Sequence, residues 1–331
     1  MPSFTPHRRQ VLLSLVLGAL ASCGPLGVHA QSANWPNKPL RMLVAFPPGG
    51  PTDLVSRVIA QRLSEQLGQP VLIDNKPGAG GNIAAEMAAN APADGYTLFY
   101  NTSAIVIGPA LYSKVNYDPV KDFAPVALTA AVPMVLVTHP GLPVRNVKEF
   151  IDHARSRPGQ LNYGSSGTGT ITHLASAMMS AQLGLQTQHV PYKGSAPALV
   201  DLSAGQTQFM IDTMNTVLPY VRDGRLRALA VSSLKRSSVL PDLPTLHESG
   251  MSGFDAAAWQ GVVVPAATPA DIVQRLNTEL NKALAHPEVR AKLAVQGADP
   301  LGGSSADYAA YIRSELPRWS KAVKDSGARV D

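Results

Sequence analysis

Two glycine-rich turns have the residue types and spacing best suited to chemistry. Pro-Pro-Gly-Gly at residues 47–50 follows an apolar run at residues 40–46 and precedes a helical pattern of apolar residues beginning at Leu54. Ser-Ser-Gly-Thr-Gly-Thr at residues 165–170 likewise lies between a β-prone run and a helical pattern. A strand, a glycine turn and a helix N-terminus direct unpaired N–H groups and a positive helix dipole at one point, which suits an anion. An ordinary strand-to-helix turn looks the same, so the pairing of two such turns carries the prediction.

The residues of the two turns favour a carboxylate over a phosphate. Neither turn has the Lys-Ser/Thr of a Walker motif, and Ile83 occupies the third glycine position of a dinucleotide fingerprint at residues 78–83. Neither turn contains the arginine or lysine that phosphate sites often use. We therefore expect the two turns to hold one carboxylate from opposite sides.

The segments around the turns alternate between strand and helix, which predicts an α/β fold with parallel strands. Thr52 or Asp53 is expected to cap the first helix, which should end near Gly68. Further helices are expected at residues 147–155 and 171–183. An apolar strand at residues 259–265 should return the chain to the first α/β unit. This arrangement places a binding crevice between two domains.

Composition narrows the class of protein. The 331 residues are 45% hydrophobic and 15% charged, which supports a packed core, and the net charge is +5 without a dense Lys/Arg run. Nucleic acid is therefore not expected as a partner. Cys23 is the single cysteine, so a chain cleaved after it has no disulfide, cysteine–zinc site or catalytic thiol.

The first thirty residues read as a signal peptide. Arg8 and Arg9 precede an apolar stretch at residues 11–20 that is too short to span a bilayer. We expect cleavage after Ala30, which leaves Gln31 as the mature N-terminus. Lipidation of Cys23 remains an alternative, and the two arginines leave Sec and twin-arginine export both open.

Other candidate residues have structural interpretations. Asp212, which ends a predicted strand, either contacts a ligand or its bridging waters or caps the next helix. His173 either contacts the ligand or, as the favoured interpretation, is a capping or core-edge histidine. The remaining histidines are dispersed, so no metal site or cofactor is predicted. A secreted serine hydrolase using Ser165 or Ser166 is disfavoured because the chain has no nucleophile elbow and no positioned acid–base partner.

Six ordered motifs resemble one family. They read WPNKPLRMLVAFPPGGPTD, DGYTLFYNTSA, LNYGSSGTGTITHLA, VPYKGSAPAL, QFMIDT and LPTLHESG. Together they resemble the extracytoplasmic solute receptors of tripartite tricarboxylate transporters, the Bug family, over nearly the whole chain after the signal peptide.

The resemblance implies an α/β, two-domain periplasmic binding protein fold of the type II-like class. Each domain would be a mixed, mostly parallel sheet flanked by helices, with the ligand cleft between the domains. We place the signal peptide at residues 1–30, domain 1 at residues 31–133 and 262–331, and domain 2 at residues 134–261. By position, the ligand-binding residues would be Pro48, Gly49, Gly50, Asp53, Asn101, Thr102, Ser103, Ser165, Ser166, Gly167, Thr168, Gly169, Thr170, Tyr192, Gly194 and Asp212.

The resemblance also implies a role. The chain would be a monomeric periplasmic receptor, not an enzyme, that captures a small organic carboxylate by domain closure. It would deliver the carboxylate to membrane permease subunits of a tripartite tricarboxylate-type transporter. A receptor that presents its ligand to a membrane signalling protein remains an alternative.

Overall fold

A computed structural model describes residues 35–237 and 239–330, and Pro36–Asp331 form one compact unit. The predicted signal peptide, the cleavage site after Ala30 and the lipidation site at Cys23 lie outside the described residues. Within those residues, no helix combines the length and apolar character needed to cross a membrane.

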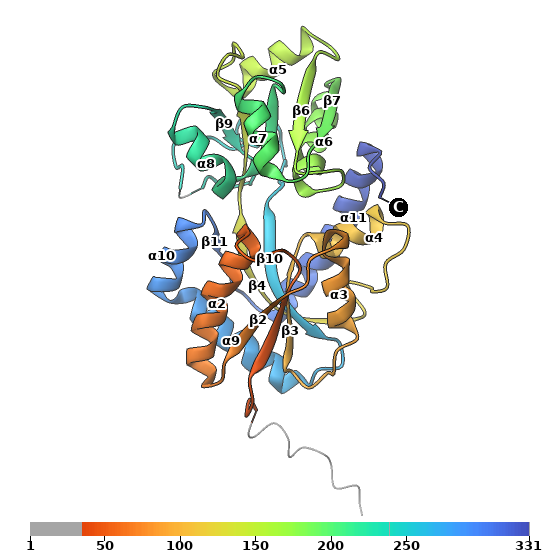
Figure 1. The fold of residues 1–331 in the computed structure, drawn as a ribbon, viewed down its shortest axis with the longest axis vertical. Helices are drawn as coiled ribbons and strands as arrows, with labels where there is room; N and C mark the ends of the chain where they lie inside the picture. Colours follow the sequence, from red (N-terminus) through yellow and green to blue (C-terminus); the bar gives the residue numbers. More distant parts are fainter. Residues whose placement is uncertain (1–34, 238, 331) are drawn as a thin grey trace, which may run out of the picture. The chain divides into compact units, whose positions relative to one another are not determined.

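In the described part of the chain, the first sheet has six strands in the order β11-β4-β10-β3-β1-β2. They are β1 (Leu40–Val44), β2 (Val71–Asn75), β3 (Thr97–Thr102), β4 (Phe123–Val132), β10 (Ala258–Pro265) and β11 (Asp299–Pro300). β1 is parallel to β2 and β3, whereas β10 is antiparallel to β3 and β4. Strands β1 to β4 therefore share one direction, and β10 confirms the predicted return of the chain to this sheet (Figure 1).

The second sheet has the order β7-β6-β8-β5-β9 over the same described residues. Its strands are β5 (Met134–Thr138), β6 (Leu161–Ser165), β7 (Thr187–Pro191), β8 (Phe209–Thr213) and β9 (Arg227–Val231). β6 is parallel to β7 and β8, and β5 is antiparallel to β8 and β9. Both sheets are thus mixed with most strands in one direction, which confirms the predicted fold class. The predicted domain boundaries stay a prediction.

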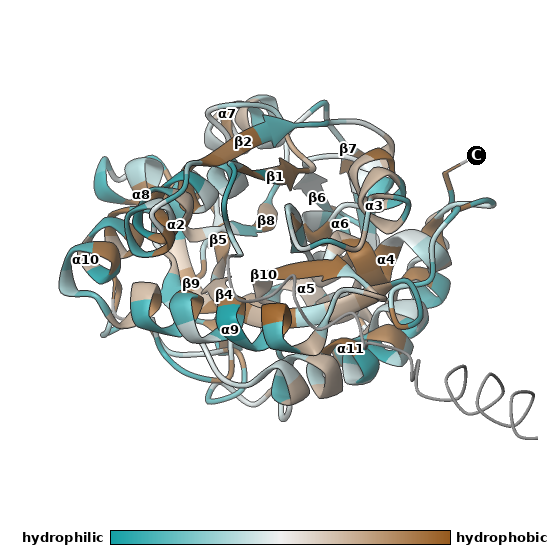
Figure 2. Ribbon diagram, turned by 90° about the horizontal axis from the view of Figure 1, so that it is seen from below, coloured by the Kyte–Doolittle hydropathy of each residue, from teal (hydrophilic) through white to brown (hydrophobic). Residues whose placement is uncertain are grey.

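Helices follow most of the strands. They are α2 (Pro51–Leu67), the short 3₁₀ helix η1 (Ala79–Gly81), α3 (Asn82–Ala89), α4 (Ala104–Leu111), α5 (Val147–Arg155), α6 (Ile171–Leu183), α7 (Ser195–Ser203), α8 (Met214–Arg222), α9 (Ala270–Ala285), α10 (Pro287–Val295) and α11 (Ser305–Ser326). Beside the first sheet, α2, α9 and α10 pack on one another, and α3, α4 and α11 form a second group (Figure 1). Figure 2 shows β10 as apolar, while α9 carries both polar and apolar residues, as expected of a helix with one buried face.

Several predicted bounds are confirmed. α5 and α6 begin and end at the predicted residues, and α2 ends before Gly68, whose φ of 68° is left-handed. The prediction that Thr52 or Asp53 caps α2 is wrong. The helix begins at Pro51, with Gly50 as its N-cap and no side-chain cap, because proline is well suited to the first helical position.

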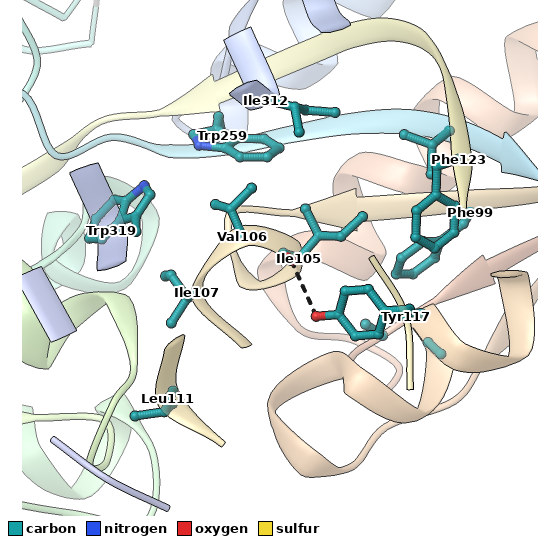
Figure 3. Packing of buried hydrophobic residues seen from close by; sticks show 14 of the residues in the cluster. Phe99, Ile105, Val106, Ile107, Leu111, Tyr117, Phe123, Trp259, Ile312 and Trp319 are labelled. Carbon is teal, nitrogen blue, oxygen red and sulfur yellow. Dashed lines mark hydrogen bonds between the residues drawn. The ribbon is translucent and has the colours of Figure 1, made fainter. Parts of the chain in front are cut away.

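The helix α4 was missed by the sequence analysis. Its residues AIVIGPAL are apolar on every side and include Gly108 and Pro109, so they show no amphipathic period. Figure 3 shows Val106 and Ile107 of α4 near Trp259 of β10 and Trp319 of α11. Five of its eight residues are buried and the other three are half-buried, which explains why this helix has no polar face.

Glu315 joins α11 to β10 inside this core. The side chain is 4% exposed, and its Oε2 accepts hydrogen bonds from Trp259 Nε1 (2.8 Å), Trp319 Nε1 (2.8 Å) and Arg318 Nη2 (2.7 Å). Arg318 also donates to the backbone oxygen of Asp255, in the segment that leads into β10 (2.7 Å). One carboxylate oxygen therefore links α11 to β10 across 56 positions of the sequence.

Candidate functional site

The side chain of Asp53 fixes the first turn, residues 46–50. The side chain of Asp53 is 1% exposed, and its Oδ2 accepts from the Gly49 amide (2.8 Å) and Arg57 Nε (2.8 Å). Its Oδ1 accepts from Asn75 Nδ2, which also donates to the Phe46 carbonyl (both 2.9 Å). Burial acts to raise the pKa of Asp53, but the hydrogen bonds from Arg57, Gly49 and Asn75 outweigh it and lower the pKa. Asp53 therefore remains charged and orders the turn.

The second turn, residues 165–170, is held by its own hydroxyl groups. The Thr170 hydroxyl donates to the Gly167 carbonyl (2.7 Å), and the Ser166 amide donates to Thr172 Oγ1 (2.8 Å). Gly167 and Gly169 have φ of 141° and 73°, which L side chains rarely adopt. The alternating glycines thus allow a tight path that the hydroxyls then fix.

Two stacked histidines, His173 and His189, contact the second turn. The rings of His173 and His189 are 3.7 Å apart and 8° from parallel, and Tyr163 stacks on His189 at 5.1 Å. His173 Nδ1 accepts from the Gly169 amide (3.0 Å), and His189 Nε2 lies 2.6 Å from Ser165 Oγ. Burial, together with the neighbouring His189, lowers the pKa of His173 to about 4. His173 is 3% exposed and lines neither cavity described below, which agrees with the favoured core-edge interpretation, and it supports the turn as a neutral acceptor.

The pair gives the protein a pH-dependent stability. In the unfolded chain His173 is protonated near its ordinary pKa of 6.5, whereas in the folded chain it is protonated only near pH 4. The stability that the neutral His173 contributes is therefore fully present above pH 6.5 and is lost as the pH falls from 6.5 to 4. The loss is at most about 3 kcal/mol. We expect urea unfolding to give a shallower pH profile between 6.5 and 4.5 for His173→Asn, whose amide oxygen accepts from Gly169 without titrating.

A matched control exists for this measurement. His247 is exposed, and its Nδ1 also accepts from a glycine amide, that of Gly253 (2.9 Å). His247→Asn should leave the profile of the wild type unchanged. Parallel profiles for wild type and His173→Asn would contradict this assignment.

Two cavities adjoin the turns, and we call them together the cleft. Their volumes are about 380 Å³ and about 200 Å³. They share Phe46, Thr102, Ser103, Ser166 and Ile171. The predicted site residues that line the cleft are Gly50, Thr102, Ser103, Ser166, Thr168, Gly169, Thr170, Gly194 and Asp212. Residues of both turns and of both sheets thus meet at one cleft.

Other predicted site residues do not line the cleft; these are Pro48, Gly49, Asp53, Asn101, Ser165, Gly167 and Tyr192. Some are engaged by their neighbours: the Tyr192 hydroxyl donates to Asp201 (2.8 Å), and Asn101 Oδ1 accepts from the Tyr308 hydroxyl (3.0 Å). Direct ligand contact by these seven residues stays a prediction. In this structure Asp53 and Ser165 support the turns.

The sequence analysis missed several lining residues. Leu111 and Tyr112 belong to the end of α4, which had no detectable period. Ser195 and Thr216 lie in the first turns of α7 and α8, and Gln260 is a polar residue within the apolar strand β10. The position of Ser195 and Thr216 just after strand ends was a usable signal, since such positions face the crevice of an α/β fold.

Five helix N-termini converge on the cleft. Gly50 of α2, Ser103 of α4, Thr170 of α6, Gly194 of α7 and Thr213 of α8 are N-cap residues that line it. Of these, only Thr170 receives a side-chain cap hydrogen bond, from the His173 amide. The lining residues of the two described cavities include no lysine, arginine or histidine. Backbone N–H groups and helix dipoles therefore supply the positive potential.

Asp212 is the one carboxylate among the residues lining these two cavities. It is 1% exposed at the end of β8, and burial raises its pKa to about 6. Its Oδ1 accepts from the Thr213 amide (2.7 Å), whereas its Oδ2 has no hydrogen-bond partner among the described residues. Thr213, not Asp212, is the N-cap of α8, so the helix-cap interpretation of Asp212 is wrong.

The pairing of Ser165 with His189 corrects the prediction that Ser165 has no acid–base partner. Ser165 does have a histidine within hydrogen-bond distance, contrary to expectation. Ser165 is, however, fully buried and lines neither cavity. Its hydroxyl also bonds to both backbone groups of Gly167 (3.1 Å each), which accounts for its position. Within the described residues no group of three or more His, Cys, Asp or Glu could hold a metal ion.

Comparison with known proteins places the chain in a family. The family model TctC, described as tripartite tricarboxylate transporter family receptor, matches residues 55–328. The chain is 36% identical to Protein BugT of Bordetella pertussis, over 96% of this chain and 98% of that protein.

Solved structures agree with this match. The structure "R. palustris Rpa4515 with adipate" has a TM-score of 0.79 and 41% identity, covering 89% of this chain and 100% of that one. MatC (Rpa3494) from Rhodopseudomonas palustris with bound malate has a TM-score of 0.74 and 34% identity, covering 87% and 100%. The family consists of solute-binding receptors rather than enzymes, and its periplasmic binding protein fold is the one described above. The resemblance predicted from the motifs is confirmed, and the chain belongs to the receptor family of the tripartite tricarboxylate transporters.

Proposed function

We propose that this receptor captures a small organic carboxylate by domain closure and delivers it, as an exported periplasmic monomer, to the membrane permease of a tripartite tricarboxylate-type transporter. The observation that carries the proposal is the convergence of five helix N-termini, four without side-chain caps, on a cleft that no described cationic side chain lines. Such a site holds an anion through N–H donors. Relatives solved with adipate and with malate support a carboxylate as that anion.

Closure would follow from the position of the turns. The first turn leads from β1 of the six-stranded sheet into α2, and the second leads from β6 of the five-stranded sheet into α6. A ligand that contacts both turns has higher affinity for the closed state, and this difference shifts the population toward it. The links at Pro133 and at residues 251–257, between the two sheets, are where we place the hinge.

The proposal predicts thermal stabilisation by carboxylates. The mature chain, unfolded and refolded to remove co-purified ligand, should gain melting temperature with at least one of adipate, malate and succinate. A ligand at 100 times its Kd adds about 2.7 kcal/mol of stability. Differential scanning fluorimetry across the panel makes the measurement.

Dimethyl adipate is the matched control, because it has the same chain but no ionised group, and it should not stabilise the protein. Stabilisation by sugars or cations with no response to any carboxylate would refute the proposal. A decrease in the radius of gyration on ligand addition, measured by X-ray scattering, tests closure separately.

A further inference from the structure

Binding of a carboxylate by the two turns does not by itself explain Asp212. A buried carboxylate normally has hydrogen bonds to both oxygens, because an unpaired buried polar atom costs free energy. Here the Thr213 amide occupies Oδ1 at 2.7 Å, and Oδ2 has no partner among the described residues although the side chain lines the larger cavity. The hydroxyls of Ser195, Thr213 and Thr216 lie near Asp212 but leave Oδ2 without a hydrogen bond, so a donor group that enters this cavity can bond to it.

The surroundings of Asp212 define the chemistry of that group. Burial has the largest effect on the pKa of Asp212 and raises it, whereas hydrogen bonding by the Ser195 hydroxyl, the Thr213 amide and the hydroxyls of Thr216 and Thr213 lowers it. The lining of the described cavity supplies no lysine, arginine or histidine. With a pKa of about 6, Asp212 is ionised at pH 7.5 and can only accept hydrogen bonds. A second ionised carboxylate placed against it would add repulsion between like charges at low dielectric.

The helix N-termini and Asp212 thus favour different groups on one ligand. The N-termini of α2 and α6 attract an anion, and Asp212 requires a donor. We infer that Asp212 is a specificity-determining residue that selects carboxylates carrying a hydrogen-bond donor, such as a hydroxyl or ammonium group, in addition to the carboxylate held by the turns. This inference rests on the proposed function.

Two matched ligand pairs test the inference by isothermal titration calorimetry at pH 7.5. Malate differs from succinate by one hydroxyl, and 6-hydroxyhexanoate replaces one carboxylate of adipate by a hydroxymethyl group. The wild type should prefer the donor-bearing member of at least one pair by about tenfold or more, since a site with an unpaired buried group discriminates strongly. Asp212→Asn, which presents an amide donor to the ligand, should remove or reverse that preference.

Asp223→Asn is the matched control, because Asp223 is an exposed carboxylate at the end of α8. It should keep the preference of the wild type. A preference that persists in Asp212→Asn overturns the inference, as does a wild type that binds both members of each pair equally. Equal binding of both ligands by the wild type overturns the inference even when Asp212→Asn fails to fold. Failure of the wild type to bind any carboxylate contradicts the proposed function and the inference with it.

Discussion

Gly169→Ala should weaken carboxylate binding about 5- to 150-fold, because overpacking typically costs ~1–3 kcal/mol and each ~1.4 kcal/mol is a factor of ten in Kd. Gly169 has a φ of 73°, and a Cβ there would overlap both methyl groups of Leu111 and lie 2.9 Å from its Cγ. Because Cγ overlaps as well as both methyl groups, rotation about the Cβ–Cγ bond of Leu111 does not relieve the contact. The second turn must move away from α4, and its ligand-facing amides move with it. Calorimetry with the strongest-binding carboxylate makes the measurement.

Two further variants separate the contact from the backbone strain. Gly159 has a φ of 75°, and a Cβ there meets no atom within 4 Å, so Gly159→Ala imposes similar strain away from the cleft and should keep wild-type affinity. Leu111→Ala combined with Gly169→Ala removes the overlap and should recover most of the affinity of Leu111→Ala alone. Equal affinities for Gly169→Ala and the wild type would refute the role of the second turn.

Glu315→Ala should destabilise the protein by about 3–5 kcal/mol, the usual cost of removing one partner from a buried charged pair. Trp259, Trp319 and Arg318 all donate to one oxygen of Glu315. The substitution leaves the two indole N–H groups unsatisfied inside the core, whereas the half-buried Arg318 keeps its hydrogen bond to the Asp255 carbonyl. The melting temperature should fall on the order of 10 °C. Urea unfolding and calorimetry of the ligand-free chain make the measurement.

Glu315→Gln is the conservative comparison. Its amide oxygen still accepts from the two indoles but carries no charge for Arg318, so its loss of stability should lie between those of the wild type and Glu315→Ala. An alanine variant as stable as the wild type would mean that the three donors find other partners. The role assigned to Glu315 in joining α11 to β10 would then be wrong.

The fold was largely predictable because most of its elements are amphipathic or bounded by strong signals. α5 and α6 have apolar residues at helical spacing, and α2 ends at a glycine with a left-handed φ. α4 was not predictable in this way, since a helix whose residues are all apolar or small has no polar stripe to mark it. The two-residue strand β11 is set by tertiary pairing with β4 and has no local signal.

The site was predictable as a location but not as a set of contacts. Both turns meet at the cleft as expected, because strand ends followed by helices converge in this class of fold. The sequence could not show that Asp53 faces Asn75, or that Ser165 faces His189, because these partners lie 22 and 24 positions away on other strands. The pair of Asp53 with Arg57 has the i,i+4 spacing of a helical ion pair and was open to prediction. It also could not distinguish Asp212, with one oxygen unsatisfied, from a helix cap.

When helix N-termini bind the acid group, main-chain groups provide affinity and side chains provide selectivity. Main-chain N–H groups are present whatever the side chains are, so the part of the cleft that holds the acid group is insensitive to most substitutions. The rest of the lining, including Leu111, Tyr112 and Asp212, consists of side chains that can be exchanged without dismantling that grip. Gene duplication followed by a few substitutions at such positions is thus a short evolutionary path from a receptor for one acid to a receptor for another.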